Sequence, residues 1–301
     1  MLLIGYKDRC RQGTEKLRER LKLYASWAFL FLVFMVNSLA HQSVSRVYEN
    51  LIKAAGRQVV ESSITALFIL SGLFFLSLAL LKVLRTGNSH FVRSIIVGWF
   101  YAMGLFALCG CFLICARIEY IHFFQYGLLA FLAAFLSSSI HGVLWGMTLL
   151  GILDEVYNYA FYPFYTSYLD FNDFLLNFAG VMMGILMYCS LFPGKGYYRE
   201  DFSTRMYGVM FFIASIIFLG LASNRIIMDV KIESKPVTVF VNGAFVFAYN
   251  SPSSFWIPLK GGGFFHILHP VEGLILLVLV VTVADQICCR ISRSCKAFLT
   301  A

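Results

Sequence analysis

The chain alternates long apolar runs with short polar connections. Runs of about 17 to 25 apolar residues predict helices that span a membrane. Eight such runs lie at about 22–40, 63–83, 95–116, 118–137, 141–160, 170–192, 206–223 and 270–287. We therefore predict an all-α polytopic membrane protein with about eight transmembrane helices.

One segment outside these runs has a β pattern. The stretch "VTVFVNGAFVFAY", residues 237–249, contains two β-rich runs joined by Asn242 and Gly243. This dipeptide fits a type I′ turn, because both central residues of that turn need positive φ. The second run is apolar on both faces and cannot stand free in water. We expect a small extracytoplasmic β-hairpin against the outer helix ends or the lipid interface.

Composition supports the membrane interpretation. The 301 residues are 59% hydrophobic and 13% charged, whereas about 25% of a typical soluble domain is charged. Most of the 24 Lys and Arg residues lie in 1–24, 82–94, 193–205 and 290–296. Basic residues concentrate in cytoplasmic loops, so this distribution predicts two cytoplasmic termini. Their positions beside helix ends also account for the net charge of +8, and we expect membrane lipids, not nucleic acid, as partners.

Polar residues gather at the predicted outer ends of three spans, where each set shares one helix face. The sets are Glu119, His122 and Tyr126; Glu155 and Asn158; and Asp170, Asp173 and Asn177, continued by Gly180 and Gly184. The two glycines allow close helix contact deeper in the membrane. We predict that the three faces converge on one outward-opening polar pocket. Asp154 points about 100° away from Glu155 around the helix and is expected to meet water or headgroups.

The pattern predicts no metal site, cofactor or disulfide. Cys109, Cys111 and Cys115 lie within an apolar run and have neither the spacing nor the polar surroundings of metal ligands. His266 and His269 form an i, i+3 pair without further ligands nearby, so we favour an interfacial loop there. His141 is expected to cap or border a helix at an inner turn.

The polar residues resemble a motif of the VanZ-like family of membrane proteins. "EYIHFFQY" is similar to the His-Phe-x-x-Tyr element of that family, and "DEVYN…DFNDFLLNFAGVMMG" is similar to its Glu-x-x-Gln…Asp-x-x-x-Asn-x-x-Gly-x-x-x-Gly element. Five positions agree at fixed spacing: Glu155, Asp173, Asn177, Gly180 and Gly184. With the preceding span, the similar region covers about residues 95–190.

Two features depart from the family motif. Asn158 stands where the family has Gln, and the loop "YAFYPFYTSYL" lacks the basic residue that the family carries there. The family is associated with low-level resistance to the glycopeptide antibiotic teicoplanin. The resemblance therefore implies a cell-envelope protein of the bacterial inner membrane, and it implies no catalytic residue.

The spans and the resemblance together divide the chain into six parts. These are a basic cytoplasmic segment at 1–24, two transmembrane helices at 25–94, the VanZ-like four-helix unit at 95–192, a cytoplasmic loop and the seventh helix at 193–223, the extracytoplasmic hairpin region at 224–269, and the last helix with a cytoplasmic tail at 270–301.

Three functions from different classes fit the polar faces. The first is binding of an amphiphilic or lipid-linked ligand in an outer-leaflet pocket, with Glu155, Asp173 and Asn177 as hydrogen-bonding groups and the aromatic loop as an apolar wall. The second is a membrane-embedded hydrolase or transferase acting on a lipid headgroup, in which Glu155 or Asp173 is a general base and His122 an acid, base or metal ligand. The third is a structural or partner-binding subunit whose polar faces hold its helices together.

Overall fold

The computed structural model describes residues 28, 31–36, 43–137, 139–161, 168–193, 212, 215–217, 219–230, 239–259 and 263–300. Within them, five helical segments are long and apolar enough to cross a membrane: Arg57–Leu84, Ser89–Phe112, Arg117–Leu136, Phe171–Leu191 and Pro270–Cys295. The chain is therefore a membrane-embedded, mostly helical protein, as its hydropathy predicts.

These segments belong to named elements of the fold. Helix α2 is Arg57–Leu84, α3 is Ser89–Phe112, α4 is Ile121–Leu136 and is preceded by the 3₁₀ turn η1 at Arg117–Tyr120, α6 is Phe171–Leu191, and α8 is Pro270–Thr300. The fifth predicted span forms the helix α5, Ile140–Phe161. It does not join the five apolar segments, because its polar residues lower its hydropathy. Most of the predicted span at 22–40 and half of that at 206–223 lie outside the described residues.

Helix α6 occupies the centre of the bundle. It contacts α2, α3, α4, α5 and α8 and is buried on almost every face. Its closest neighbour is α4, where a Cβ built on Gly180 would lie 2.8 Å from the carbonyl oxygen of Phe123. A Cβ on Gly184 would overlap the carbonyl oxygen of Gly127. The two backbones therefore touch along a stripe that side chains would hold apart.

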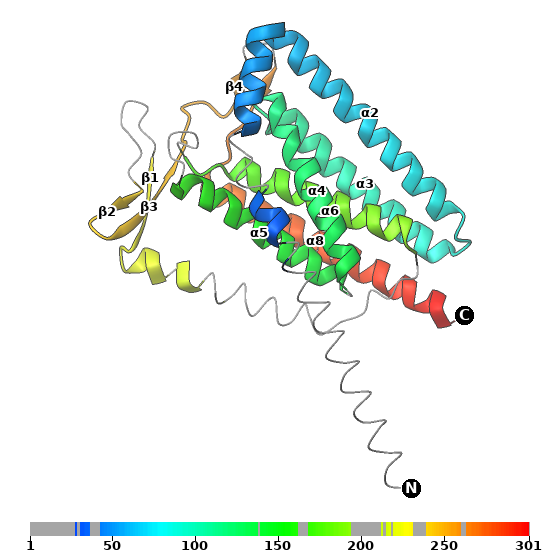
Figure 1. Ribbon diagram of the computed structural model, residues 1–301. Helices are drawn as coiled ribbons and strands as arrows, with labels where there is room; N and C mark the ends of the chain where they lie inside the picture. The colour runs from blue at the N-terminus through cyan, green and yellow to red at the C-terminus, as the bar shows by residue number, and fades with distance from the viewer. Residues whose placement is uncertain are drawn as a thin grey trace, which may run out of the picture.

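Helix α2 lies along one flank of the bundle (Figure 1). Its outward surface is apolar, and Leu67 and Leu70 are 68% and 66% exposed. Such a surface is stable beside lipid tails rather than water. On its inward side, Phe68 stacks on Phe106 of α3 and Tyr120 of η1, with ring centroids 5.1 and 4.7 Å apart. This aromatic contact attaches α2 to the remaining helices.

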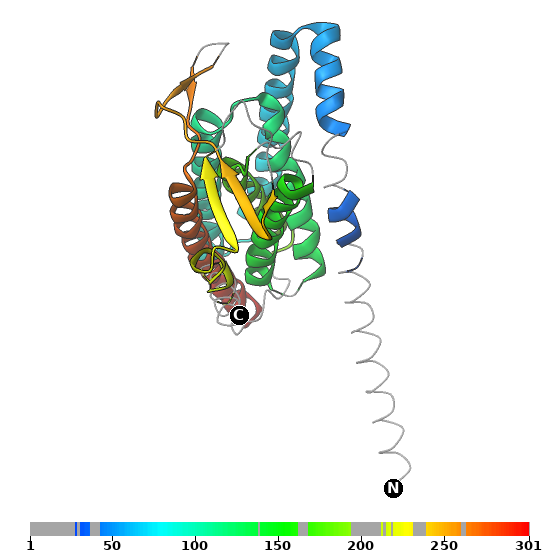
Figure 2. The same cartoon turned by 90° about the vertical axis from the view of Figure 1, so that its left-hand side faces the viewer.

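A small sheet lies at the end of the bundle next to the last turns of α5 (Figures 1 and 2). Its central strand β3, Ala244–Tyr249, pairs antiparallel with β2, Phe240–Val241, across Asn242 and Gly243, whose φ values are 50° and 78°. The third strand β1, Ile226–Val230, pairs parallel with β3 and is absent from the sequence prediction. A separate ribbon joins β4, Ile257–Pro258, to β5, Phe264–Phe265.

Tyr159 fixes the sheet to the helices. Its hydroxyl donates to the carbonyl oxygen of Val246 at 2.6 Å and accepts from the backbone N–H of Ala248 at 2.9 Å. The backbone N–H of Leu169 donates to the carbonyl oxygen of Ala248 at 2.8 Å, just before α6 begins. The strand is thus hydrogen-bonded to α5 through Tyr159 and to Leu169 before α6, and this end of the bundle is called the sheet end below.

Candidate functional site

Three helices bring polar side chains together near the sheet end, and Asn177 of α6 links them. Its Oδ1 accepts a hydrogen bond from Nδ1 of His122 of α4 at 2.7 Å. Its Nδ2 donates to Oε1 of Glu155 of α5 at 3.0 Å and more weakly to the carbonyl oxygen of Gly151 at 3.4 Å. His122, Glu155 and Asn177 are each at most 4% exposed, so the amide satisfies groups that water does not reach.

His122 lies between two carboxylates. Its Nδ1 is 3.8 Å from Oε1 of Glu155, and its Nε2 is 3.7 Å from Oδ1 of Asp173. Ligand atoms of these three side chains all lie within 4.8 Å of one another. With Nδ1 donating to Asn177, Nε2 faces Asp173 and can hold either a proton or a cation. An imidazole nitrogen and two carboxylate oxygens form a donor set that fits a divalent metal ion.

Asp154 belongs to the same buried region, and the prediction that it meets water or headgroups is wrong. The hydroxyl of Tyr126 donates to its Oδ2 at 2.8 Å, and the residue is only 2% exposed. Helices α4, α6 and α8 all pack against α5. Faces of α5 that differ by about 100° are therefore both covered.

Asn158 is a buried polar residue near Glu155. It is 4% exposed, and within the described part of the chain its Nδ2 has no hydrogen-bond partner. A buried donor without a partner costs about 1–3 kcal/mol, so native proteins retain few of them. An acceptor brought by a ligand would satisfy this group.

Glu119 and Asp170 act at helix starts and make no direct hydrogen bond to the Asn177 network. The carboxylate of Glu119 accepts from the backbone N–H groups of Cys115 and Ala116 at 2.9 and 3.1 Å. Glu119 lies in the 3₁₀ turn η1, three residues before His122, and these two backbone N–H groups hold its carboxylate.

Asp170 caps α6. Its Oδ1 accepts from the backbone N–H of Asn172 at 2.9 Å, and its Oδ2 accepts from the hydroxyl of Tyr168 at 3.1 Å. Burial raises the pKa of the Asp170 carboxyl to about 7, and the negative charge of Asp173 adds to this rise. Its carboxylate group is therefore poised to change charge near neutral pH.

Two glycines missing from the sequence prediction shape the polar region. Gly127 forms the α4 side of the contact with Gly184, and a Cβ on Gly151 would lie 3.1 Å from Cβ of Asn177 and 3.3 Å from the ring of Tyr126. A Cβ at this position would press on Asn177, which approaches the carbonyl oxygen of Gly151. An apolar run with scattered glycines gives no signal of which glycine meets which helix.

An apolar groove lies on the other side of the α4–α6 pair. It has a volume of about 390 Å³ and is lined by residues of α2, α3, α4 and α6, among them Phe68, Trp99, Phe123, Leu128 and Met187. Helix α5 contributes nothing to its lining, and neither do the polar residues around Asn177. The polar region and this groove are therefore separate features.

His141, which was expected to cap or border a helix at an inner turn, lies in the first turn of α5 and is buried there. It is 6% exposed at the start of α5, and its Nδ1 lies 2.8 Å from Oδ1 of Asp285 of α8. Three aromatic residues of the predicted wall, Tyr162, Phe164 and Tyr165, lie outside the described residues. His266 contacts the carbonyl oxygen of Phe255 and the carboxylate of Glu272, at 2.8 and 3.2 Å.

No family model, curated protein or solved structure matches the chain. The fold and the polar cluster thus define a class, a multi-pass membrane protein with buried ionisable side chains at one end of its bundle.

Proposed function

We propose that the protein binds an amphiphilic or lipid-linked ligand through the polar cluster, as a VanZ-like component of the cell envelope. The observation that carries this proposal is the convergence of His122, Glu155, Asp173 and Asn177 from three helices. Ionisable residues inside a membrane protein are expensive to bury and commonly mark a ligand, ion or proton site. The Nδ2 of Asn158, which has no hydrogen-bond partner among the described residues, adds a donor that a ligand would satisfy.

The charges of the cluster restrict the ligand. Among the described residues, His122 is the only ion-pair partner of Glu155 and of Asp173. Two carboxylates facing one imidazole in a low-dielectric environment favour a proton, a cation or a hydrogen-bond donor. We infer that the ligand presents amine or hydroxyl groups. A phosphate-bearing headgroup would need a divalent cation between its oxygens and the carboxylates.

Native mass spectrometry of the detergent-purified protein tests ligand binding. We expect a lipid or other amphiphile to co-purify with the wild type and to be lost from the Glu155→Gln/Asp173→Asn variant. Asp229→Asn, on exposed strand β1, is the matched control and should keep it. An identical ligand load on all three proteins, or none on any, contradicts the proposal.

The link to the cell envelope has its own test. In a glycopeptide-susceptible bacterial host, expression of the wild type is expected to lower teicoplanin susceptibility. Glu155→Gln and Asp173→Asn should weaken that effect while the protein level in the membrane stays the same. An unchanged phenotype in both variants argues against a role for this cluster in the envelope.

A second function is favoured by one observation. The ligand atoms of His122, Glu155 and Asp173 lie within 4.8 Å of one another, which suits metal-assisted hydrolysis or transfer at a lipid headgroup. The metal would polarise an oxygen of the headgroup, and the carboxylate not needed for binding would act as general base. Turnover of a lipid extract by metal-loaded protein supports this function. Failure to bind any divalent metal at these residues removes it.

A further inference from the structure

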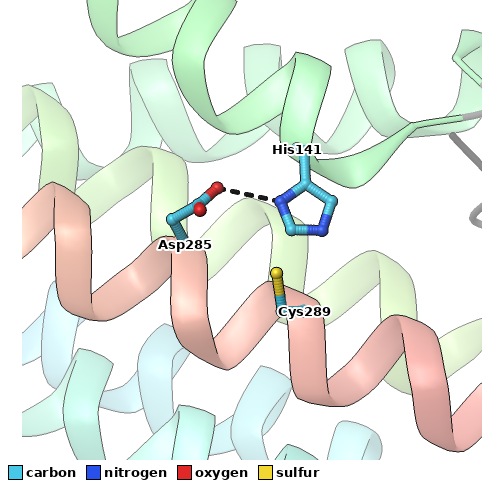
Figure 3. Close-up of side chains that lie close together, drawn as sticks. All are labelled: His141, Asp285 and Cys289. Carbon is cyan, nitrogen blue, oxygen red and sulfur yellow. Dashed lines mark hydrogen bonds and ion pairs between the residues drawn. The ribbon is translucent and has the colours of Figure 1, made fainter. Parts of the chain in front are cut away.

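A second group of ligand-type side chains lies near the opposite end of α5. His141 projects from the first turn of α5, and Asp285 and Cys289 project toward it from α8 (Figure 3). Ligand atoms of the three residues all lie within 4.8 Å of one another. Along α5, 14 residues separate His141 from Glu155, or about 21 Å at 1.5 Å per residue. The two groups are therefore independent.

The fold directs these three side chains toward one another. Asp285 and Cys289 are i, i+4 on α8 and so occupy adjacent positions on one helix face. His141 and Asp285 are 6% and 3% exposed, and Cys289 is half-buried. The arrangement thus buries an acid and an imidazole and leaves the thiol of Cys289 partly exposed.

Trp145 orients the carboxylate. One turn after His141, its indole Nε1–H donates to Oδ1 of Asp285 at 3.1 Å, the same oxygen that lies 2.8 Å from Nδ1 of His141. A hydrogen bond from a neighbouring residue to a ligating carboxylate is a regular feature of metal sites, because it fixes the position of the oxygen.

We propose that His141, Asp285 and Cys289 bind a divalent transition metal ion of the zinc type. A thiolate and an imidazole select zinc or cobalt over magnesium and calcium, which take oxygen ligands. Three protein ligands leave a fourth tetrahedral position for water or another group. On binding, the thiol of Cys289 gives its proton to solvent, and the neutral ring of His141 moves its proton from Nδ1 to Nε2.

Only small movements are needed to admit the ion. Zinc ligands at about 2.0–2.3 Å from the metal lie roughly 3.3–3.7 Å apart in a tetrahedral site. The Nδ1 of His141 and Oδ1 of Asp285 must therefore separate by about half an ångström from their distance of 2.8 Å. The other two pairs of ligand atoms lie up to 4.8 Å apart and must move closer together. A purely structural His–Asp–Trp contact would use neither the thiol nor a metal.

Cobalt(II) titration of the purified, metal-stripped full-length protein tests this site. A cobalt ion bound by Cys289 gives a thiolate-to-cobalt charge-transfer absorption, whereas the His122, Glu155 and Asp173 cluster contains no sulfur and cannot. We expect the absorption to saturate with one metal per chain, and zinc to abolish it by competition. The result therefore separates this proposal from the function proposed for the polar cluster.

Variants test which residues bind the cobalt ion that gives the charge-transfer absorption. Cys289→Ser and His141→Ala should each weaken cobalt binding by about tenfold or more, while Cys288→Ser, at the adjacent buried cysteine, keeps it. His122→Gln/Asp173→Asn should also keep it. Absence of charge-transfer absorption in the wild type, or its persistence in Cys289→Ser, overturns the proposal.

A measurement on the unmutated chain covers the case in which a variant fails to fold. Zinc is expected to slow alkylation of Cys289 by a maleimide, with peptide mapping by mass spectrometry as the readout. Labelling of Cys111, which is exposed, should not change. Equal labelling of Cys289 with and without zinc contradicts metal binding at this site.

Discussion

The amide of Asn177 is the residue on which the polar cluster depends. One side chain satisfies His122, Glu155 and the backbone of Gly151 at once. The sequence does not show these three contacts. The i, i+3, i+7 spacing of Asp170, Asp173 and Asn177 indicated only that Asn177 faces the other polar helices. The pattern could not show its partners, because a helix face fixes a direction and leaves contacts to the packing.

Comparison of two buried asparagines tests this role. We expect Asn177→Ala to lower the free energy of unfolding by about 2–4 kcal/mol, because it leaves two buried polar partners unsatisfied. Asn158→Ala should lower it by much less, since its Nδ2 has no partner among the described residues. Thermal or denaturant unfolding in detergent measures both. A larger loss of stability for Asn158→Ala than for Asn177→Ala would contradict the stabilising role of Asn177.

Asp170 makes the stability of the protein depend on pH. Its carboxyl has a pKa of about 7 in the folded state against an ordinary value of 3.8, chiefly because it is buried. The folded state therefore binds the proton more tightly than the unfolded chain does. The stability gained from this proton is complete below about pH 4 and is lost as the pH rises through about 7.

We expect the melting temperature to fall between pH 5 and pH 8 and the Asp170→Asn variant to show a flatter profile. The amide oxygen of the variant can still accept from the N–H of Asn172, so the cap is retained. Asp229→Asn, at an exposed position, should leave the slope unchanged. An unaltered slope in Asp170→Asn would show that other groups cause the pH dependence.

The α4–α6 contact is the element-scale feature that holds the polar residues in register. The spacing of Gly180 and Gly184 indicated a close helix contact, and the structure places both against the backbone of α4. The sequence could not identify α4 as the partner or Gly127 as the matching glycine. That choice depends on how all the helices share the available surface, which no single helix encodes.

A matched pair of glycine substitutions tests this contact. Gly184→Ala is expected to destabilise the protein by about 1–3 kcal/mol, since its Cβ overlaps the carbonyl oxygen of Gly127 and the helices must separate. Gly104→Ala on α3 meets no atom within 4 Å and should be neutral or slightly stabilising. Melting temperatures in the same detergent provide the comparison. Equal shifts would show that helix propensity alone is being measured.

At the scale of the whole molecule, the small sheet covers one end of the helix bundle. Composition and hydropathy predicted a helical membrane protein, and the pattern of residues 237–249 predicted a β-hairpin against the outer helix ends or the lipid interface. The Asn242–Gly243 turn also lies where the pattern put it. The parallel strand β1 was not predicted, because its pairing joins residues 226–230 to 245–249, and short exposed strands carry little periodicity. Tyr159 is the first residue of the aromatic loop that was predicted to form an apolar wall, yet it is fully buried beneath β3.

Removal of one hydroxyl tests how the sheet is held. Tyr159→Phe loses the bonds to Val246 and Ala248, and we expect faster hydrogen exchange in β3 together with a loss of about 1–3 kcal/mol. Tyr249→Phe, in the same strand, is the control and should leave exchange unchanged. Protection of β3 that persists in Tyr159→Phe would mean that ring packing alone secures the sheet.

The polar character of α5 has a consequence for how the protein is made. A helix that carries His141, Asp154 and Glu155 gains less from entering lipid than its neighbours do, so it relies on them for insertion. Its partners on α4 precede it at the ribosome, those on α6 follow soon after, and Asp285 on α8 emerges more than a hundred residues later. The end of α5 near the sheet can therefore pack against its partners early. Its opposite end can pack against Asp285 only after α8 has been made.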